Sequence, residues 1–291
     1  MSRPNSYGYV AERYKPFDYI EFTDGMMSRC EYGIIGSIKP SDGGNGAELR
    51  IVSLYDGKTV DLDTSHRNVS LIPKKPIVLE DIVTNGERDR DCVTFEDICS
   101  CHALATESLP ENLPLSDIVN VPSGAVLGIV LEADGDGETD DISLRGAFVD
   151  CCEDGSIVRL AVIDDDSEFP VIKSFMLDGT GVRIVSMRVE RELDGDDADT
   201  VVAAVSFSQL SRQLSLVNDA MDDVHDAMMA NTLCAPVESF GTSESVADSL
   251  AANASQQAFK RYADVYDMLE RQSKMIVDAM RDIENDADVL M

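Results

Sequence analysis

The pattern of hydrophobic and polar positions changes at Phe17, where short segments of the kind that form β-strands begin. From Phe17 to Pro73, short segments rich in β-branched residues are separated by turn signals such as Asp56-Gly57, a dipeptide that favours tight hairpin turns. The strands predicted from this pattern are 19–22, 32–38, 48–55, 59–62 and 69–72. Five short strands in so little sequence predict a small β-barrel over residues 17–76.

A comparable order of short segments recurs later in the chain and predicts a second β-barrel-like domain over residues 122–205. Its segments are Gly128-Ile129-Val130, Leu144-Arg145, Asp154-Gly155-Ser156-Ile157-Val158 and Val182-Arg183-Ile184-Val185. The intervening residues 77–121 are predicted to be a linker. They include a short helical patch near Phe95 to Ala105 and a connection that contains Pro110 and Pro114.

Residues 206–291 show helical periodicity, with apolar positions three and four residues apart in two runs. This pattern predicts a helical hairpin or coiled coil, whose second helix opens near Thr242 or Ser243 and runs for about 45 residues, or about 65 Å. The first helix covers only part of that length. Either another subunit buries the remaining seam, or the second helix breaks and folds back. The predicted assembly seam is Leu214, Val217, Met221, Val224, Met228, Tyr262, Tyr266, Leu269, Ile276, Met280 and Ile283.

The first 16 residues are predicted to form an aromatic arm. Tyr7, Tyr9 and Tyr14 precede the first predicted strand. Because rigid amphipathic rings are favoured at protein interfaces, these tyrosines are candidate anchors on a neighbouring subunit. The alternative is that they pack against their own domain.

The charge of the chain changes which partners are expected. The 291 residues include 55 Asp and Glu against 24 Lys and Arg, which gives a net charge of −31, and residues 101–250 carry 30 of the acids with only 7 bases. Direct binding to nucleic acid or to an anionic membrane surface requires clustered basic residues, so neither is expected. No apolar stretch approaches the length of a membrane span, and seven cysteines without a secretion signal indicate reduced thiols in a cytosol.

Two clusters are candidates for metal binding. Asp134, Asp136, Glu138 and Asp140 alternate as carboxylates do in calcium loops, but Thr139 stands where such loops need glycine, and a solvated hairpin tip is the alternative. Cys99, Cys101 and His102, with Cys92 nearby, offer soft ligands for zinc. Their spacing suits one tetrahedral ion poorly, so packing in a core is favoured instead.

No catalytic motif is complete in this sequence. Gly57-Lys58-Thr59 lacks the first glycine of a phosphate-binding loop, because Val52 stands at that position. None of the three histidines lies in a nucleophile motif. The sequence therefore predicts a protein without enzymatic activity and without a cofactor.

The spacing of the predicted strands resembles that of SH3-like small barrels of the Tudor and KOW type, on Gly33-Ile34-Ile35, Leu49-Arg50-Ile51 and Asp56-Gly57-Lys58-Thr59-Val60. The expected fold is therefore α+β, with two SH3-like modules followed by a helical hairpin or coiled coil. Such a combination looks like a head, neck or tail component of a tailed-phage virion. This resemblance implies a homo-oligomeric structural protein that contacts other structural proteins, in the virion or the host cytoplasm. The alternative is an acidic binding module that imitates nucleic acid and sequesters a basic protein.

Overall fold

The computed structural model describes residues 6–24, 30–42, 45–66, 69–74, 77, 82–83, 93–133, 142–152, 156–163, 170–177, 182–233 and 246–285. The chain divides into two compact units. The first contains residues 1–208 and 283–291, and the second contains residues 209–282. We refer to them as unit 1 and unit 2.

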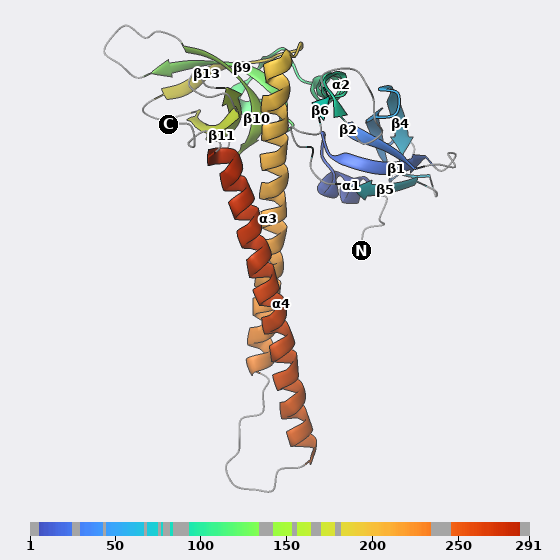
Figure 1. Cartoon of the computed structure of the whole chain (residues 1–291), viewed down its shortest axis with the longest axis vertical. Coiled ribbons are helices and arrows are strands. Elements are labelled where there is room, and N and C mark those ends of the chain that lie inside the picture. The colour runs from blue at the N-terminus through green and yellow to red at the C-terminus, as the bar shows by residue number, and fades with distance from the viewer. Residues whose placement is uncertain are drawn as a thin grey trace. The chain divides into compact units, whose positions relative to one another are not determined.

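The first sheet of unit 1 has five strands in the order β4-β3-β2-β1-β5, and all neighbours are antiparallel (Figure 1). Every strand overlaps one of the segments predicted from the sequence. Its core includes Ile20, Phe22, Ile35, Leu49 and Ile51, all essentially inaccessible to solvent. The strands are β1 (Tyr19–Asp24), β2 (Glu31–Pro40), β3 (Ala47–Ser53), β4 (Thr59–Asp63) and β5 (Val69–Pro73).

The second sheet has the order β12-β11-β10-β9-β13-β8, and β12 also pairs with β13 in parallel at Met176 and Arg183. Each of the strands β9 to β13 therefore pairs with at least two others. The strands are β8 (Asn112–Leu113), β9 (Val126–Ala133), β10 (Ile142–Cys151), β11 (Ile157–Ile163), β12 (Pro170–Met176) and β13 (Val182–Val189). A separate parallel pair is formed by β6 (Ile82–Val83) and β7 (Val93–Thr94).

The helices are α1 (Tyr7–Arg13), α2 (Phe95–Thr106), the 3-10 helix η2 (Leu115–Asn120), α3 (Gly195–Leu233) and α4 (Val246–Asn285). Two sheets of mainly antiparallel strands with C-terminal helices make this an α+β chain, so the predicted class is confirmed. The helix α2, expected within the linker 77–121, packs on the first sheet, where the Cys101 thiol donates to the Ile35 carbonyl at 3.2 Å.

The two sheets follow one structural plan. In each, the second strand shifts register against the third, after Ile35 in β2 and after Phe148 in β10. The backbone N–H of Phe17 donates to Ile35 at 2.7 Å, and that of Gly124 donates to Phe148 at 2.7 Å. Likewise Lys74 donates to Tyr19, and Glu190 donates to Val126, both at 2.9 Å. We call residues 7–106 repeat 1 and residues 115–208 repeat 2.

The helix that follows each sheet begins with the same reciprocal cap, which satisfies backbone N–H groups that the first helical turn leaves unpaired. In α2, the Thr94 hydroxyl accepts from the Asp97 N–H at 3.2 Å, and Asp97 accepts from the Thr94 N–H at 3.0 Å. In α3, Asp194 and Asp197 make the equivalent pair, at 3.1 and 2.9 Å. The second helix continues to Leu233 and supplies the first helix of unit 2.

The helices α2 and α3 each contact the other repeat. Thr106 and Ser206 hold equivalent places in α2 and α3. The Thr106 carbonyl accepts from Arg191, just after β13, at 2.7 Å, and the Ser206 hydroxyl donates to the Ile77 carbonyl, just after β5, at 2.9 Å. Phe17 lies against its own equivalent, Gly124. These contacts join the two repeats within unit 1.

Unit 2 consists of 25 residues of α3 (209–233) and 37 residues of α4 (246–282), together with the segment that joins them. The two helices run in opposite directions (Figure 1). Val217 of α3 and Ile276 of α4 are the buried apolar residues described in this unit. A helical hairpin with a narrow apolar seam is the result.

Candidate functional site

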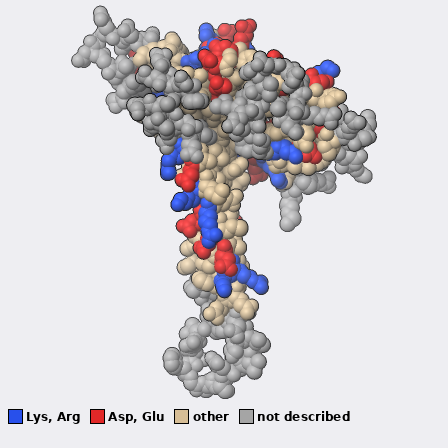
Figure 2. Space-filling model, in the orientation of Figure 1, with Lys and Arg blue, Asp and Glu red and all other residues tan. Residues whose placement is uncertain are grey.

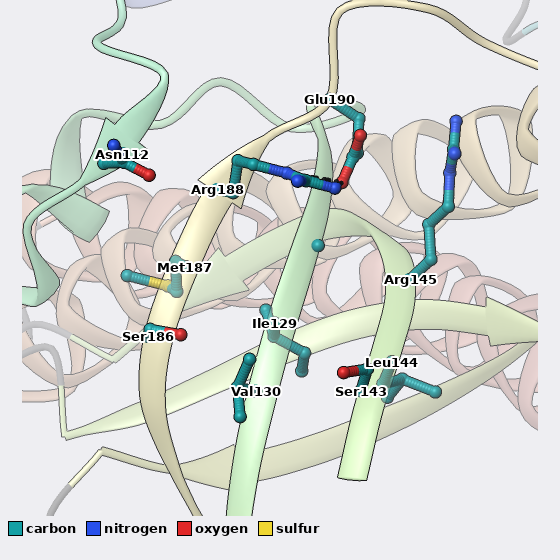
Figure 3. Close-up of a pocket in the computed structure, with 11 residues that line it drawn as sticks. Asn112, Ile129, Val130, Ser143, Leu144, Arg145, Ser186, Met187, Arg188 and Glu190 are labelled. Carbon is teal, nitrogen blue, oxygen red and sulfur yellow. Dashed lines mark hydrogen bonds and ion pairs between the residues drawn. The ribbon is translucent and has the colours of Figure 1, made fainter. Parts of the chain in front are cut away.

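The solvent-exposed face of the second sheet carries a groove with a volume of about 450 Å³. Its floor is formed by β9 between β10 and β13, and β8 closes one side (Figure 3). The lining residues are Asn112, Gly128, Ile129, Val130, Ser143, Leu144, Arg145, Ser186, Met187, Arg188 and Glu190.

Strand register arranges the groove in two rows across the sheet. Gly128 lies between Arg145 of β10 and Arg188 of β13, and two residues further along β9, Val130 lies between Ser143 and Ser186. Because side chains alternate between the faces of a strand, both rows point to the same face. The groove therefore places two guanidinium groups on either side of a residue that has no side chain.

Each guanidinium is paired with a carboxylate from its own repeat. Arg188 donates to Glu190 Oε1 at 2.7 Å, and Arg145 donates to Asp197 Oδ1 at 2.7 Å and to the Glu192 carbonyl at 2.7 Å. Burial alone would lower the pKa of Arg145, but its hydrogen bond to Asp197 and the nearby carboxylates outweigh this and raise that pKa. Both arginines therefore stay charged.

The equivalent positions in repeat 1 are filled. By strand register, Glu21 of β1 corresponds to Gly128, and Tyr32 of β2 corresponds to Arg145. Lys74 makes an ion pair with Glu21 at 2.6 Å and lies 5.2 Å from the centre of the Tyr32 ring. Repeat 2 is hollow because glycine replaces the glutamate and because Arg145 is drawn towards Asp197.

The groove can bind a ligand mainly through neutral polar groups. Ser143, Ser186 and Asn112 present hydroxyl and amide groups to it. An anion would have to compete with Glu190 for Arg188 and with Asp197 for Arg145. No sequence motif identified the residues that line the groove, because only the register of three strands brings them together.

The residues predicted as metal ligands are only partly within the described part of the chain. Asp134, Asp136, Glu138 and Asp140 lie outside the described residues, as does Cys92. Among the residues that are described, no group of three or more His, Cys, Asp or Glu side chains is placed to hold a metal ion.

Cys101 and His102 lie in the interior of unit 1, while Cys99 is half-buried. Burial raises the pKa of the Cys101 thiol above its ordinary value. His102 Nε2 accepts the Val126 N–H at 3.0 Å, so the ring joins α2 of repeat 1 to β9 of repeat 2. Burial, with Arg191 and Arg145 nearby, lowers the pKa of His102 to about 4, so it is neutral at pH 7. Cys101 and His102 are therefore packed in the interior, which is the alternative to zinc binding.

The residues of the predicted assembly seam differ in burial. Val217 and Ile276 are buried, Tyr262 is exposed, and the side chain of Ile283 is not among those described. The remaining members, Leu214, Met221, Val224, Met228, Tyr266, Leu269 and Met280, are half-buried. Two helices thus cover this seam incompletely.

The predicted aromatic arm contains the helix α1. Tyr14 is buried in the core of repeat 1, and its hydroxyl donates to the Leu71 carbonyl at 3.0 Å. Tyr9 packs at the edge of the same core and accepts a hydrogen bond from Arg13. Tyr7 is exposed. For Tyr14 and Tyr9, packing against their own domain is the alternative that the structure shows.

No protein-family model matches the chain, and neither a curated protein nor a solved structure matches it. Among the described residues, no helix is both long enough and apolar enough to cross a membrane.

Proposed function

We propose that this chain is a non-enzymatic structural protein that assembles with itself and with other structural proteins, as a virion component of a tailed phage. In this proposal the two repeats are SH3-like modules, and the hairpin is a coiled-coil assembly element. The strand order supports the first part, because the fifth strand of each repeat pairs with the first and the remaining strands follow in sequence. The virion assignment rests on analogy of architecture.

The observation that carries the proposal is the incomplete burial of the seam of α4 within unit 2. The helix α4 contributes twelve more residues than α3, which corresponds to about 18 Å of helix. Phe259 and Tyr262 continue the seam of α4 but are exposed, whereas Ile276 further along is buried. Exposed aromatic residues that continue a buried seam are typical of a surface that another chain covers.

The test is the mass of the full chain in solution, measured by light scattering over a range of protein concentrations in low and high salt. We expect an oligomer whose mass is the same at both salt concentrations, because apolar contacts are little affected by screening. A monomer under all conditions would contradict the proposal.

A second function, as an acidic binding module for a basic protein, is favoured by the outer face of α3. Asp219, Asp222, Asp223 and Asp226 are all exposed there and fall on one side of the helix. Binding of this kind would weaken steeply with salt. Titration with a basic polypeptide such as polylysine would distinguish it, with Asp222→Asn/Asp226→Asn as the variant that should lower the affinity.

A further inference from the structure

The helix α4 carries a second apolar stripe, distinct from the seam that faces α3. Val265, Met268 and Met275 are 40%, 58% and 72% exposed. They are spaced three and seven residues apart, and Ala279 extends the same stripe. Large side chains left this accessible at heptad spacing form a candidate interface.

Geometry prevents α3 from covering this stripe. Each stripe position stands one residue before a seam position, as Val265 does before Tyr266, Met268 before Leu269 and Met275 before Ile276. Consecutive residues of an α-helix are separated by about 100° around its axis. A partner that packs on the seam therefore leaves the stripe to a different partner.

The charges beside the stripe indicate which partner that is. Asp264 and Arg271 lie seven residues apart, both exposed, along the side of the stripe away from the seam. Within the described part of the chain, neither makes an ion pair. Acidic and basic side chains alternate along the helical unit on the face shown in Figure 2. A surface with one acid and one base at such a spacing is complementary to itself.

We propose that two copies of this chain associate through the stripe of α4, with the two α4 helices antiparallel and related by a two-fold axis midway between Asp264 and Arg271. The axis places each Asp264 opposite Arg271 of the other copy and brings the two Met268 side chains together. A parallel pair would instead set Asp264 level with Asp264. This contact deepens the proposed self-assembly and rests on it.

Met268→Glu in the full chain tests the stripe, because it puts two carboxylates at the centre of the contact. We expect light scattering to show half the wild-type mass at concentrations where the wild type is associated. Met229→Glu is the matched control, since Met229 is also about half exposed but lies on α3. The control should keep the wild-type mass, and circular dichroism should show that both variants retain their helices.

The charge pair is tested by reversal. Asp264→Arg and Arg271→Asp should each weaken association about tenfold, because each sets like charges opposite one another twice in the symmetric contact. The double variant, which exchanges the two charges, should restore the wild-type dissociation constant within about threefold.

The outcomes separate the two proposals. An associated wild type whose mass is unchanged by Met268→Glu overturns the stripe contact and leaves self-assembly standing. A double charge variant no tighter than the single variants overturns the antiparallel register. A wild type that is monomeric at every concentration overturns both.

Discussion

Phe17 and Gly124 occupy the same position in the two repeats, share a positive backbone φ of 68° and 88°, and touch each other. This region of φ favours glycine, because a side chain there crowds its own backbone. At Gly124 there is no room for one, since a Cβ atom would lie 2.8 Å from Val205 and 3.0 Å from the Phe17 ring. Phe17 keeps the same backbone conformation while its ring is buried against that glycine.

Substitutions of Phe17 should separate the cost of losing its buried ring from the cost of its positive φ. Phe17→Ala and Phe17→Gly both lose a buried aromatic side chain, which costs about 3–5 kcal/mol. Glycine adopts positive φ without strain, so Phe17→Gly should be more stable than Phe17→Ala by about 1 kcal/mol. Urea denaturation of the two variants measures the difference. An alanine variant that is the more stable of the two would mean that φ at residue 17 relaxes.

Two glycines of repeat 2 should respond differently to alanine. At Gly128, a Cβ would overlap only the end of the Glu190 side chain, which is flexible, so Gly128→Ala should cost about 1 kcal/mol or less. At Gly146, it would lie 2.6 Å from Val162 and 2.7 Å from the Ala161 carbonyl, which is backbone. Gly146→Ala should therefore cost about 2–3 kcal/mol. Thermal unfolding of both variants measures the two losses of stability. Equal losses would contradict this prediction.

His102 should make stability depend on pH. Its folded pKa of about 4 lies below the ordinary value of 6.5, so between these values the unfolded chain binds a proton that the folded chain does not. Its contribution is complete above pH 6.5 and is lost as the pH falls towards 4, by about 1.4 kcal/mol per unit and about 3 kcal/mol in all.

The matched variant for this titration is His102→Gln, whose amide oxygen can accept the Val126 N–H but does not titrate in this range. We expect the urea midpoint of the wild type to fall more steeply from pH 6.5 to 4 than that of the variant. Parallel curves would show that the pKa of His102 is the same in the folded protein as in the unfolded chain.

The boundary of unit 1 predicts where the chain can be shortened. Val201, Val202, Ala204 and Phe207 are buried in unit 1, although they belong to the long helix α3. A chain that ends at Ser208 should unfold cooperatively, because it keeps these side chains. A chain that ends at Asp194 loses them and should be much less stable, by more than about 5 kcal/mol. Circular dichroism during heating distinguishes the two, and equal melting temperatures would contradict the assignment.

Local signals in the sequence predicted much of the secondary structure, although not the helix α1 or the strand β12. Short β-branched segments between turn signals located the strands of repeat 1, and spacing of three and four residues located α3 and α4. The recurrence of strand segments after Gly128 was also visible. The equivalence of individual positions in the two repeats could not be seen in the sequence, because the equivalent residues differ in type: Glu21 corresponds to Gly128, and Tyr32 corresponds to Arg145. Only backbone hydrogen bonds and strand register identify these pairs.

The groove was not predictable for a related reason. Arg145, Gly128 and Arg188 come from three strands, and no short segment carries their arrangement. The seam on α4 was predicted from heptad spacing, but that spacing does not distinguish a partner helix in the same chain from one in another chain. The second stripe, with Met268 and Met275, became apparent only when the exposure of each side chain was known.

The unequal lengths of α2 and α3 have a consequence for how often each surface occurs in an assembly. One chain contributes two equivalent β units but only one helical hairpin, because α2 ends at Thr106 whereas α3 continues to Leu233. Any assembly of n chains would therefore contain 2n β units and n hairpins. A surface that both β units present would recur twice as often in it as a surface of the hairpin.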